Sequence, residues 1–528
     1  MDVIITADRI DAGPSGAQAL GIRDGRIVAV GDRREARAWR TARTRTIDVG
    51  DACVLPGFID GHSHPVLGAD LTRGVALGEV TTVAELQAAL GAAHGTLPPD
   101  VWLHGWGLRP DALGGAEPHR RVIDVVVGGR PCLIRTFDGH SALANGAALR
   151  AAGVVSSVAL EGEAQIVCDE QGAPTGYLRE PAAVAVVEMA SPAVPFAERA
   201  RALRAALAGM ARAGLTAVHS LEFPEGAAAL YEALESEGSL PVRVRAMPWC
   251  EADATPDRWA EIAAMQSRAG RRWRVGGAKL FLDGTIDDGT AWLSEPDTRG
   301  ASAASIWADS RAYAAAVAWF DARGIATATH AIGNAAVLQA LDVIDRTRRA
   351  PHRIEHIEYL SVADTARFAR SRAYAGMQPT HGTDYVDPLG SDNWSIRLGR
   401  ERALRAWPLG DLDAAGVAVV LGSDWPIAPY DPRAVIAAAH LRRQAGRPSA
   451  PALARSQALS VQSAIDGYTV RAAASVADVD AGRIAVGTTA DLTVFAHDPR
   501  TTDLDVFADA PVVATIVDGD PVHLANAW

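Results

Sequence analysis

Short apolar runs of strand-like composition recur along the chain, and most of them end in a histidine or an aspartate. They are separated by stretches rich in alanine, leucine and arginine with helical spacing, as in residues 197–213, 309–323, 335–348 and 362–371. Strands that alternate with helices favour βαβ units and a parallel sheet. Eight such units, with polar residues at the carboxyl ends of the strands, predict an α/β fold. The expected type is a TIM-like (β/α)8 barrel with its active site on that face.

The first run, Val-Leu-Pro-Gly-Phe-Ile-Asp-Gly-His-Ser-His, ends in His62 and His64. Residues i and i+2 of an extended segment point to the same side, so both imidazoles are able to bind one ion. Later runs end at His330, His356 and Asp424. Because the carboxyl ends of barrel strands meet on one face, we expect these side chains to converge.

Lys279 is the only lysine in a chain with 51 lysine and arginine residues in total. Lysine is normally among the commonest residues, yet here it stands only in the apolar stretch Gly-Gly-Ala-Lys-Leu-Phe-Leu-Asp-Gly. Arginine cannot lose its proton in a protein, whereas a buried lysine can become neutral and nucleophilic. A neutral amine can also capture carbon dioxide as a carbamate, an anionic ligand able to bridge two metal ions. The alternative explanation is chance together with codon bias, since structural ion pairs also hold single lysines.

Histidine, lysine and aspartate side chains at the strand ends together supply six ligands, the number that a two-metal hydrolytic site needs. They are His62, His64, Lys279, His330, His356 and Asp424. A single histidine is more often a core or loop residue. The order of these residues along successive strands favours a metal site instead.

Eight motifs carry a resemblance to a known family. They are Leu-Pro-Gly-Phe-Ile-Asp-Gly-His-Ser-His (55–64), Asp-Gly-His-Ser-Ala-Leu-Ala-Asn-Gly (138–146), Pro-Thr-Gly-Tyr-Leu-Arg-Glu (174–180), Lys-Leu-Phe-Leu-Asp-Gly-Thr (279–285), His-Ala-Ile-Gly-Asn (330–334), Arg-Ile-Glu-His (353–356), Gly-Ser-Asp-Trp-Pro (422–426) and Gly-Arg-Ile-Ala-Val-Gly-Thr-Thr-Ala-Asp-Leu (482–492). With them the chain resembles the amidohydrolase superfamily over nearly its whole length. Within that superfamily it is similar to the amidohydrolase family 3 branch of N-substituted formamide deformylase-like and exoenzyme-regulatory-like metal-dependent hydrolases.

Two departures from the family pattern concern substrate contacts. Asn334 stands where the family usually has aspartate, and Gly-Leu-Arg at 107–109 replaces a usual Gly-Trp-Asp. The resemblance implies that His62, His64 and Asp424 bind the more buried of two divalent ions. It also implies that Lys279 bridges both ions as a carbamate, while two further histidines bind the second ion. Those two are His330 and His356. Zinc suits such ligands, and manganese, iron or cobalt would also fit.

The expected activity is metal-dependent hydrolysis of a C–N bond in a small N-substituted amide or formamide. A metal-bridged hydroxide is the expected nucleophile, and Asp424 is the expected general base and then general acid. His219 is expected to be structural. Six other residues are predicted substrate contacts: His140, His381, Asp283, Gln378, Trp425 and Trp106.

Three alternative functions stay open. One is a one-metal aminohydrolase that deaminates a ring; such relatives usually carry glutamate three residues after the histidine of the fifth barrel strand, where this chain has Gly333. Another is an esterase or lactonase, which uses the same metals. The third is a non-catalytic scaffold, which would require missing ligands.

The two ends of the chain have similar strand-and-turn patterns. Residues 1–54 and 477–528 are rich in β-branched residues and contain Asp-Gly hairpin signals at 24–25 and 518–519. We expect them to form one small composite β-sandwich, as in relatives. Residues 55–476 would form the catalytic barrel, with an inserted subdomain at about 70–210 after the first barrel strand.

A net charge of −12 and the absence of a basic stripe disfavour nucleic acid as a partner. Short arginine pairs, 271–272 and 442–443, are expected on the solvated surface. Four scattered cysteines indicate free thiols and a cytoplasmic location. We expect no signal peptide and no membrane span. A small-molecule substrate and a possible homodimer complete the predictions.

Overall fold

The computed structural model describes residues 1–13, 16–114, 116–137, 139–160, 164–238 and 240–525. Asp138, which opens the motif at 138–146, lies outside this range, as do residues 526–528 of the predicted terminal segment. Contacts divide the chain into two units, Met1–Pro65 with Arg204–Trp528, and Val66–Leu203. The second unit overlaps the insertion predicted at about 70–210.

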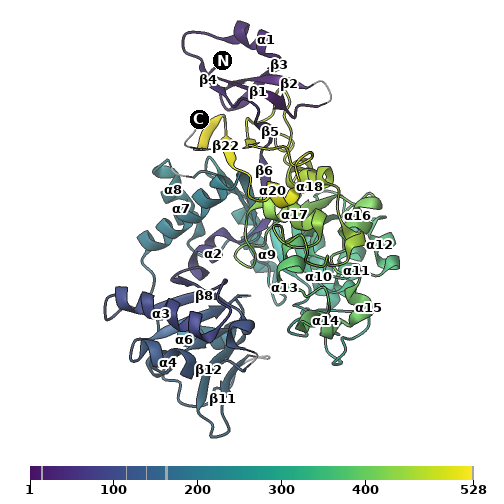
Figure 1. Cartoon of the computed structure of the whole chain (residues 1–528). Coiled ribbons are helices and arrows are strands. Elements are labelled where there is room, and N and C mark those ends of the chain that lie inside the picture. The colour runs from purple at the N-terminus through teal and green to yellow at the C-terminus, as the bar shows by residue number, and fades with distance from the viewer. Residues whose placement is uncertain (14–15, 115, 138, 161–163, 239, 526–528) are drawn as a thin grey trace. The chain divides into compact units, whose positions relative to one another are not determined.

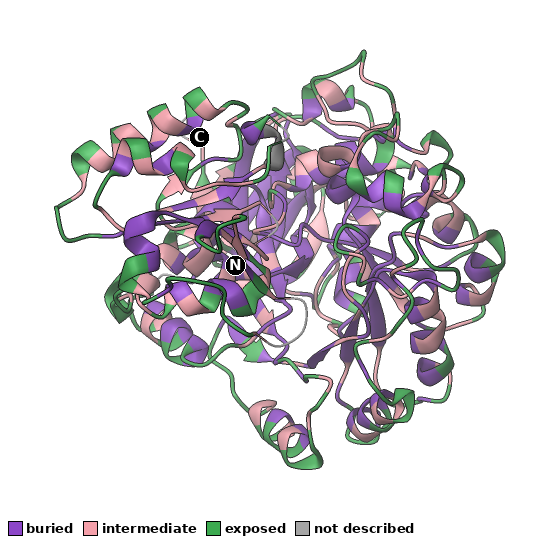
Figure 2. Cartoon of the chain, turned by 90° about the horizontal axis from the view of Figure 1, so that it is seen from below, coloured by how far each residue is buried: buried purple, intermediate pink, exposed green. Residues whose placement is uncertain are grey.

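Two parallel sheets form the centre of the first unit. One has four strands in the order β15 (Trp273–Val275), β14 (Arg243–Ala246), β13 (Leu215–Ser220) and β6 (Phe58–Ser63). The other has five, in the order β16 (Ala278–Phe281), β17 (Thr327–Ala331), β18 (His352–His356), β19 (Tyr374–Met377) and β20 (Val419–Leu421). Most of their residues are buried (Figure 2), as expected of parallel strands covered on both faces.

Backbone hydrogen bonds connect the two sheets at both edges. On one side, Lys279 N donates to Pro248 O at 2.9 Å and Cys250 N donates to Lys279 O at 2.8 Å. On the other side, Asp424 N donates to His62 O at 2.7 Å, and His64 N donates to Trp425 O at 2.8 Å. The mixed α/β class is therefore confirmed.

Helices follow the strands of the first unit, as the helical spacing predicts (Figure 1). Their bounds are α1 (Arg33–Trp39), α8 (Ala227–Ser236), α9 (Pro256–Met265), α10 (Ser310–Asp321), α11 (Asn334–Ile344), α12 (Val362–Phe368), α13 (Pro379–Tyr385), α14 (Asn393–Leu398), α15 (Arg400–Ala403), α16 (Leu409–Ala414), α17 (Pro432–Leu441), α18 (Val461–Tyr468), α19 (Val470–Ala474) and α20 (Leu504–Phe507), with a short 3-10 turn η2 (Arg455–Gln457). In α10 the buried residues Tyr313, Val317 and Phe320 recur at helical spacing and form one apolar face.

Strands from both ends of the chain share one eight-stranded sheet (Figure 1). Its order is β23 (Asp520–Leu524), β22 (Val512–Val517), β21 (Leu492–Phe495), β5 (Cys53–Pro56), β1 (Val3–Ile10), β2 (Ala17–Arg23) and β3 (Arg26–Gly31), with β4 (Arg45–Asp48) also paired to β1. Both Asp-Gly steps are hairpin turns with positive φ at each residue, 50° and 71° at 24–25, and 55° and 76° at 518–519. Two-residue turns of this kind require such values. The two-layer sandwich stays a prediction.

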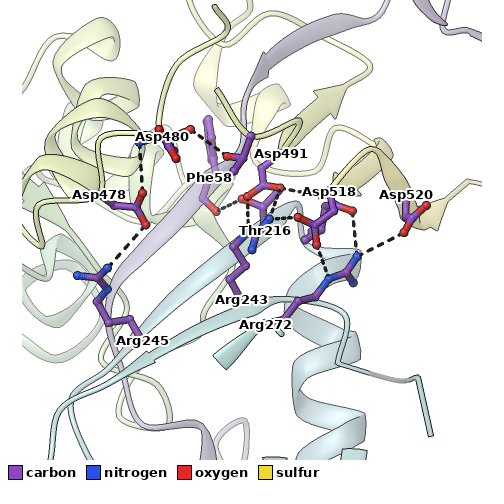
Figure 3. A network of polar contacts seen from close by, with 12 residues as sticks. Phe58, Thr216, Arg243, Arg245, Arg272, Asp478, Asp480, Asp491, Asp518 and Asp520 are labelled. Carbon is purple, nitrogen blue, oxygen red and sulfur yellow. Dashed lines mark hydrogen bonds and ion pairs between the residues drawn. The ribbon is translucent and has the colours of Figure 1, made fainter. Parts of the chain in front are cut away.

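A polar network joins this sheet to the strands of the four-stranded sheet (Figure 3). Arg243 on β14 binds Asp491 at 2.7 Å and also contacts Asp518. Arg272, only 6% exposed, binds Asp518 at 2.9 Å and donates to two backbone carbonyls, Leu240 O and Val517 O. A buried guanidinium needs partners of this kind.

The predicted surface position is wrong for one member of each arginine pair. Arg272 is buried for the reason just given, and Arg442 is 0% exposed. Arg442 donates to Leu453 O at 3.1 Å and Ala406 O at 2.9 Å. Both side chains bind backbone carbonyls that are distant in sequence, and the local sequence does not reveal these partners.

We predict that Asp518→Ala lowers the stability of the fold by roughly 2 kcal/mol, because it removes the carboxylate that binds the buried Arg272 at 2.9 Å. The measurement is the thermal unfolding midpoint by circular dichroism. Asp520→Ala is the matched control: Asp520 contacts Arg272 at 3.6 Å, but its side chain is 71% exposed. We expect that control to change stability by less than about 0.5 kcal/mol. Equal losses in both variants would contradict the prediction.

Asp321, at the end of α10, fixes the turn that precedes β18. Its carboxylate accepts hydrogen bonds from the backbone amides of residues 348–350 at 2.9–3.0 Å and contacts His352 Nε2 at 3.2 Å. Burial alone would raise its pKa, but these bonds outweigh burial and lower the pKa to about 2. The unfolded-state value is near 3.9. The stabilisation is therefore fully present above about pH 4 and is lost as the pH falls toward 2.

We predict that Asp321→Asn unfolds at a lower temperature than the unsubstituted chain at pH 6, and that the difference narrows as the pH is lowered from about 5 to about 3. Differential scanning calorimetry at a series of pH values measures this. If the difference in unfolding temperature between the two chains stays constant over the pH series, the ionised carboxylate of Asp321 does not stabilise the fold in this way.

The second unit, Val66–Leu203, is an α/β unit with its own cores. Its sheet has the order β11 (Gln165–Cys168), β12 (Pro174–Arg179), β10 (Ala142–Ala144), β9 (Cys132–Thr136), β8 (Leu103–Leu108) and β7 (Val75–Ala76). Its helices are α2 (Pro65–Leu71, which begins one residue before the unit), α3 (Val83–Thr96), α4 (Arg121–Val127), α5 (Gly146–Ala151) and α6 (Glu180–Glu188), with a 3-10 turn η1 (Pro110–Leu113); α7 (Phe196–Arg212) continues into the first unit. Among the described residues, no helix combines the length and apolar character needed to cross a membrane.

Candidate metal centre

Asp424 lies just beyond β20 and faces the two histidines at the carboxyl end of β6, His62 and His64. Its Oδ1 is 3.2 Å from His62 Nε2 and 3.1 Å from His64 Nε2. Asp424 is 6% exposed and His62 is 1% exposed. The spacing of i and i+2 on β6 thus brings two imidazoles to one carboxylate oxygen, as the sequence predicts.

The Gly-Ser-Asp sequence before this carboxylate is needed for a close approach of two strands. A Cβ on Gly422 would lie 2.4 Å from the backbone nitrogen of His62, so only glycine fits there. Ser423 Oγ donates to buried Asp60 at 2.6 Å, and Ser423 N donates to it at 3.0 Å. Burial raises the pKa of Asp60 to about 6. These contacts fix Asp424, which has a left-handed φ of 59°.

The other oxygen of Asp424 faces a second pair of histidines. Oδ2 is 4.0 Å from His356 Nδ1, at the end of β18, and 3.8 Å from His381 Nε2, in the first turn of α13. Asp424 therefore belongs to two groups of potential ligands, one with His62 and His64 and one with His356 and His381, and the ligand atoms of each group lie within 4.8 Å of one another.

His330 ends β17 beside this second pair. Its ring centroid is 4.3 Å from that of His356. Its Nε2 hydrogen-bonds Gly284 O at 3.2 Å, which leaves Nδ1 as the nitrogen available to a ligand. The predicted ligand thus lies in the cluster, with its ring held by a backbone carbonyl.

Lys279 on β16 is 1% exposed, and its ammonium nitrogen lies 5.2 Å from the ring centroid of Phe281. Among the described residues, Nζ has no hydrogen-bond partner. Burial lowers the pKa of Lys279 to about 8, although the charges of Glu355 and Asp424 oppose the shift. Roughly a tenth of the amine is then neutral at pH 7, the form that the predicted carbamate requires.

Glu355 and Arg353 lie against the predicted ligand His62, although the sequence did not single them out as site residues. Glu355 Oε2 lies 2.8 Å from His62 Nδ1, and Arg353 binds Glu355 through Nε at 2.6 Å. Arg353 also donates to Gly61 O at 2.6 Å and contacts His219 Nδ1 at 2.9 Å. The available signal is the motif Arg-Ile-Glu-His, where i, i+2 spacing puts two charges on the inner face of a buried strand.

Two of the residues predicted to contact substrate, Gln378 and Asp283, bind other parts of the centre. Gln378 Nε2 lies 3.2 Å from His62 Nδ1. Asp283 accepts hydrogen bonds from Ile332 N, Gly333 N and Trp292 N at 2.8–2.9 Å, so it positions the loop after His330. Burial raises the pKa of Asp283 to about 7. The predicted substrate contacts of these residues stay predictions.

Three further residues were predicted to contact substrate: Trp425, His140 and Trp106. Trp425 is 8% exposed, and its ring centroid lies 5.7 Å from that of Tyr430. His140 and Trp106 belong to the Val66–Leu203 unit, where His140 Nδ1 lies 3.5 Å from Glu180 Oε2. Their contact with substrate also stays a prediction.

The protonation states of the cluster fit divalent metal ions. Burial lowers the pKa of His64, His356 and His381, and that of His330 to about 3. Neutral imidazole is the form that binds metals. Burial opposes ionisation of Asp424, but His62 and His64 outweigh it and hold its pKa well below the usual range.

Several buried atoms that face the cluster lack hydrogen-bond partners in the described part of the chain. They are His62 Nε2, His356 Nδ1, His381 Nε2 and Lys279 Nζ. Leaving a buried polar atom unpaired costs about 1–3 kcal/mol, and a metal ion would satisfy the three imidazole nitrogens. The residues present therefore suit a metal centre.

The fold is shared with a solved metal-dependent hydrolase. An uncharacterized metal-dependent hydrolase from Pyrococcus horikoshii OT3 shares the fold, with a TM-score of 0.76 at 22% identity over 95% of this chain and 99% of that chain. The profile of the amidohydrolase family matches residues 45–523, and the chain belongs to this family.

Two relatives match over nearly their full length. The putative amidohydrolase YtcJ of Bacillus subtilis (strain 168) is 28% identical over 96% of this chain and 96% of that protein. The N-substituted formamide deformylase of Arthrobacter pascens is 26% identical over 97% of this chain and 95% of that protein. The predicted membership of the family is confirmed, and the chain is an enzyme, a metal-dependent amidohydrolase that acts on C–N bonds.

We predict that Glu355→Gln lowers the affinity for Zn²⁺ about 10–100-fold, the usual effect of losing a carboxylate that orients a metal-binding histidine. Equilibrium dialysis with elemental analysis measures this. Glu358→Gln is the matched control, because buried Glu358 instead accepts a hydrogen bond from Trp394 Nε1 at 2.6 Å. Equal zinc affinity in both variants would refute the role given to Glu355.

Proposed function

We propose that this enzyme is a binuclear metal-dependent hydrolase that cleaves the C–N bond of small N-substituted amides or formamides. One observation carries the proposal: the buried carboxylate of Asp424 presents one oxygen to His62 and His64 and the other to His356 and His381. A carboxylate with donors on both oxygens can serve two ion positions. The similarity to an N-substituted formamide deformylase supports the substrate class.

We also propose that the two parallel sheets close into one (β/α)8 barrel. The hydrogen bonds of Lys279 with residues 248 and 250, and those of residues 62 and 64 with residues 424 and 425, support closure. In such a barrel, all strand ends that carry donors open on one face.

Two divalent ions, zinc being the first expectation, would be held by His62, His64, His330, His356, Asp424 and a carbamate on Lys279, and would lower the pKa of bound water and polarise the substrate carbonyl. The ionised carboxylate of Asp424 accepts the proton of the attacking water and returns it to the leaving nitrogen. Glu355 keeps the His62 ring oriented through its bond to Nδ1. Asp283 holds the backbone after His330.

The alternative of a one-metal aminohydrolase is disfavoured at position 333. A Cβ added to Gly333 would lie 2.1 Å from Trp292 O, so the glutamate of those relatives has no room here. Esters and lactones remain substrates to be compared in the same assay.

The test combines metal content with hydrolysis of a panel of N-formyl and N-acyl amines, matched esters and lactones, on protein grown with zinc and bicarbonate. We expect about two ions per chain and preferential hydrolysis of the amides. Asp424→Asn should lower kcat by a factor of about 100–10,000, and Lys279→Ala should lose bound metal. His497→Ala is the control, since His497 is exposed. One ion per chain, unchanged in Lys279→Ala, would refute the binuclear centre.

A further inference from the structure

His381 lies where the chain turns from β19 into α13. Gln378, Pro379 and Thr380 precede it, and the helix starts at Pro379, so the side chain of His381 projects from the first helical turn. His381 is 8% exposed. The sequence predicts a substrate contact at this residue. In the structure, however, His381 lies beside Asp424 and His356, two predicted metal ligands.

One nitrogen of the His381 ring has nothing to bind within the protein. Nε2 is buried and has no hydrogen-bond partner among the residues that the structure describes. Leaving a buried polar atom unpaired costs about 1–3 kcal/mol. Imidazole is the commonest metal ligand among side chains, so a metal ion would satisfy this nitrogen.

The free nitrogen of this ring is directed at the carboxylate of the centre. His381 Nε2 lies 3.8 Å from Asp424 Oδ2, and His356 Nδ1 lies 4.0 Å from the same oxygen. The His356 and His381 rings are stacked, with centroids 6.2 Å apart. Ligand atoms of these three residues lie within 4.8 Å of one another, and all three residues are buried.

A substrate contact would leave these observations unexplained. His356 Nδ1 and His381 Nε2 are buried without a hydrogen-bond partner among the described residues, and at 4.0 and 3.8 Å both lie too far from Asp424 Oδ2 to bond it directly. A cation between them satisfies the two nitrogens and the oxygen. His330, whose ring is held by Gly284 O, is compatible with the same ion.

We propose that His381 is a ligand of the second metal ion, which it binds together with His356 and Asp424. The assignment rests on the binuclear centre of the proposed function and adds to it a ligand from the seventh barrel position. A divalent ion of the zinc type, which accepts imidazole and carboxylate ligands, is the group that this site would take.

The decisive variant is His381→Asn, because asparagine keeps a polar side chain at this buried position while Nε2 is removed. We expect its affinity for the more weakly held Zn²⁺ to fall roughly 100-fold or more, beyond the usual effect of an outer partner. Titration calorimetry of the metal-free full chain with Zn²⁺ measures this. The absorption spectrum of the Co²⁺-loaded protein should change as well, since a ligand is lost.

Thr383→Ala is the matched control, because Thr383 lies on the same helix and its hydroxyl bonds only within the segment, to Thr380 O and Asp384. We expect it to bind both ions as the unsubstituted chain does. His381→Gln serves as a second variant if His381→Asn fails to fold by circular dichroism.

The outcomes separate this inference from the proposed function. Two ions in the unsubstituted chain, with the second weakened only in the His381 variants, would support both. Two ions bound equally by all variants, with an unchanged Co²⁺ spectrum, would overturn the role of His381 and leave the binuclear centre standing. A single ion or none in the unsubstituted chain would overturn both.

Discussion

The centre depends on one buried negative charge, the carboxylate of Asp424. Removing a carboxylate from water costs several kcal/mol unless positive charge or hydrogen-bond donors compensate. Here the neighbours are four imidazoles, two on each oxygen. Two hydrogen bonds to Asp60 fix Ser423, the residue before Asp424, and in the proposed function a cation would supply further compensation.

A buried ion pair, Arg353 with Glu355, lies behind the His62 ligand. Arg353 and Glu355 are both fully buried, and they neutralise one another. Arg353 also binds a backbone carbonyl of β6, Gly61 O, while Glu355 binds His62 on the same strand. The orientation of a predicted ligand is thus tied to the register of two strands that lie nearly 300 residues apart in sequence.

Much of the centre could be predicted from sequence because strand periodicity has an exact geometric meaning. The i, i+2 spacing of His62 and His64 on an extended strand brings both to one oxygen of Asp424. Burial of arginine could not be predicted in the same way: Arg272 and Arg442 look like surface pairs, yet distant carbonyls bind them. The position of His381 beside Asp424 could not be predicted either, since only the tertiary structure brings its ring to that carboxylate.

The same distinction applies to the fold. Alternating strands and helices were readable from local composition, and so were the Asp-Gly turns, because each depends on a few adjacent residues. The additional strand β15 was not, since Trp273–Val275 is short and becomes a strand only by pairing with β14.

The crowding around Gly333 limits how this enzyme can diverge. The carbonyl of Trp292 occupies the space that a side chain at position 333 would need. The backbone amide of Trp292 in turn donates a hydrogen bond to Asp283, which fixes this segment. A point mutation cannot install a proton donor at this position. A descendant with ring-deaminating chemistry would first have to shorten or reroute the segment around residue 292, so its evolutionary path runs through insertions and deletions.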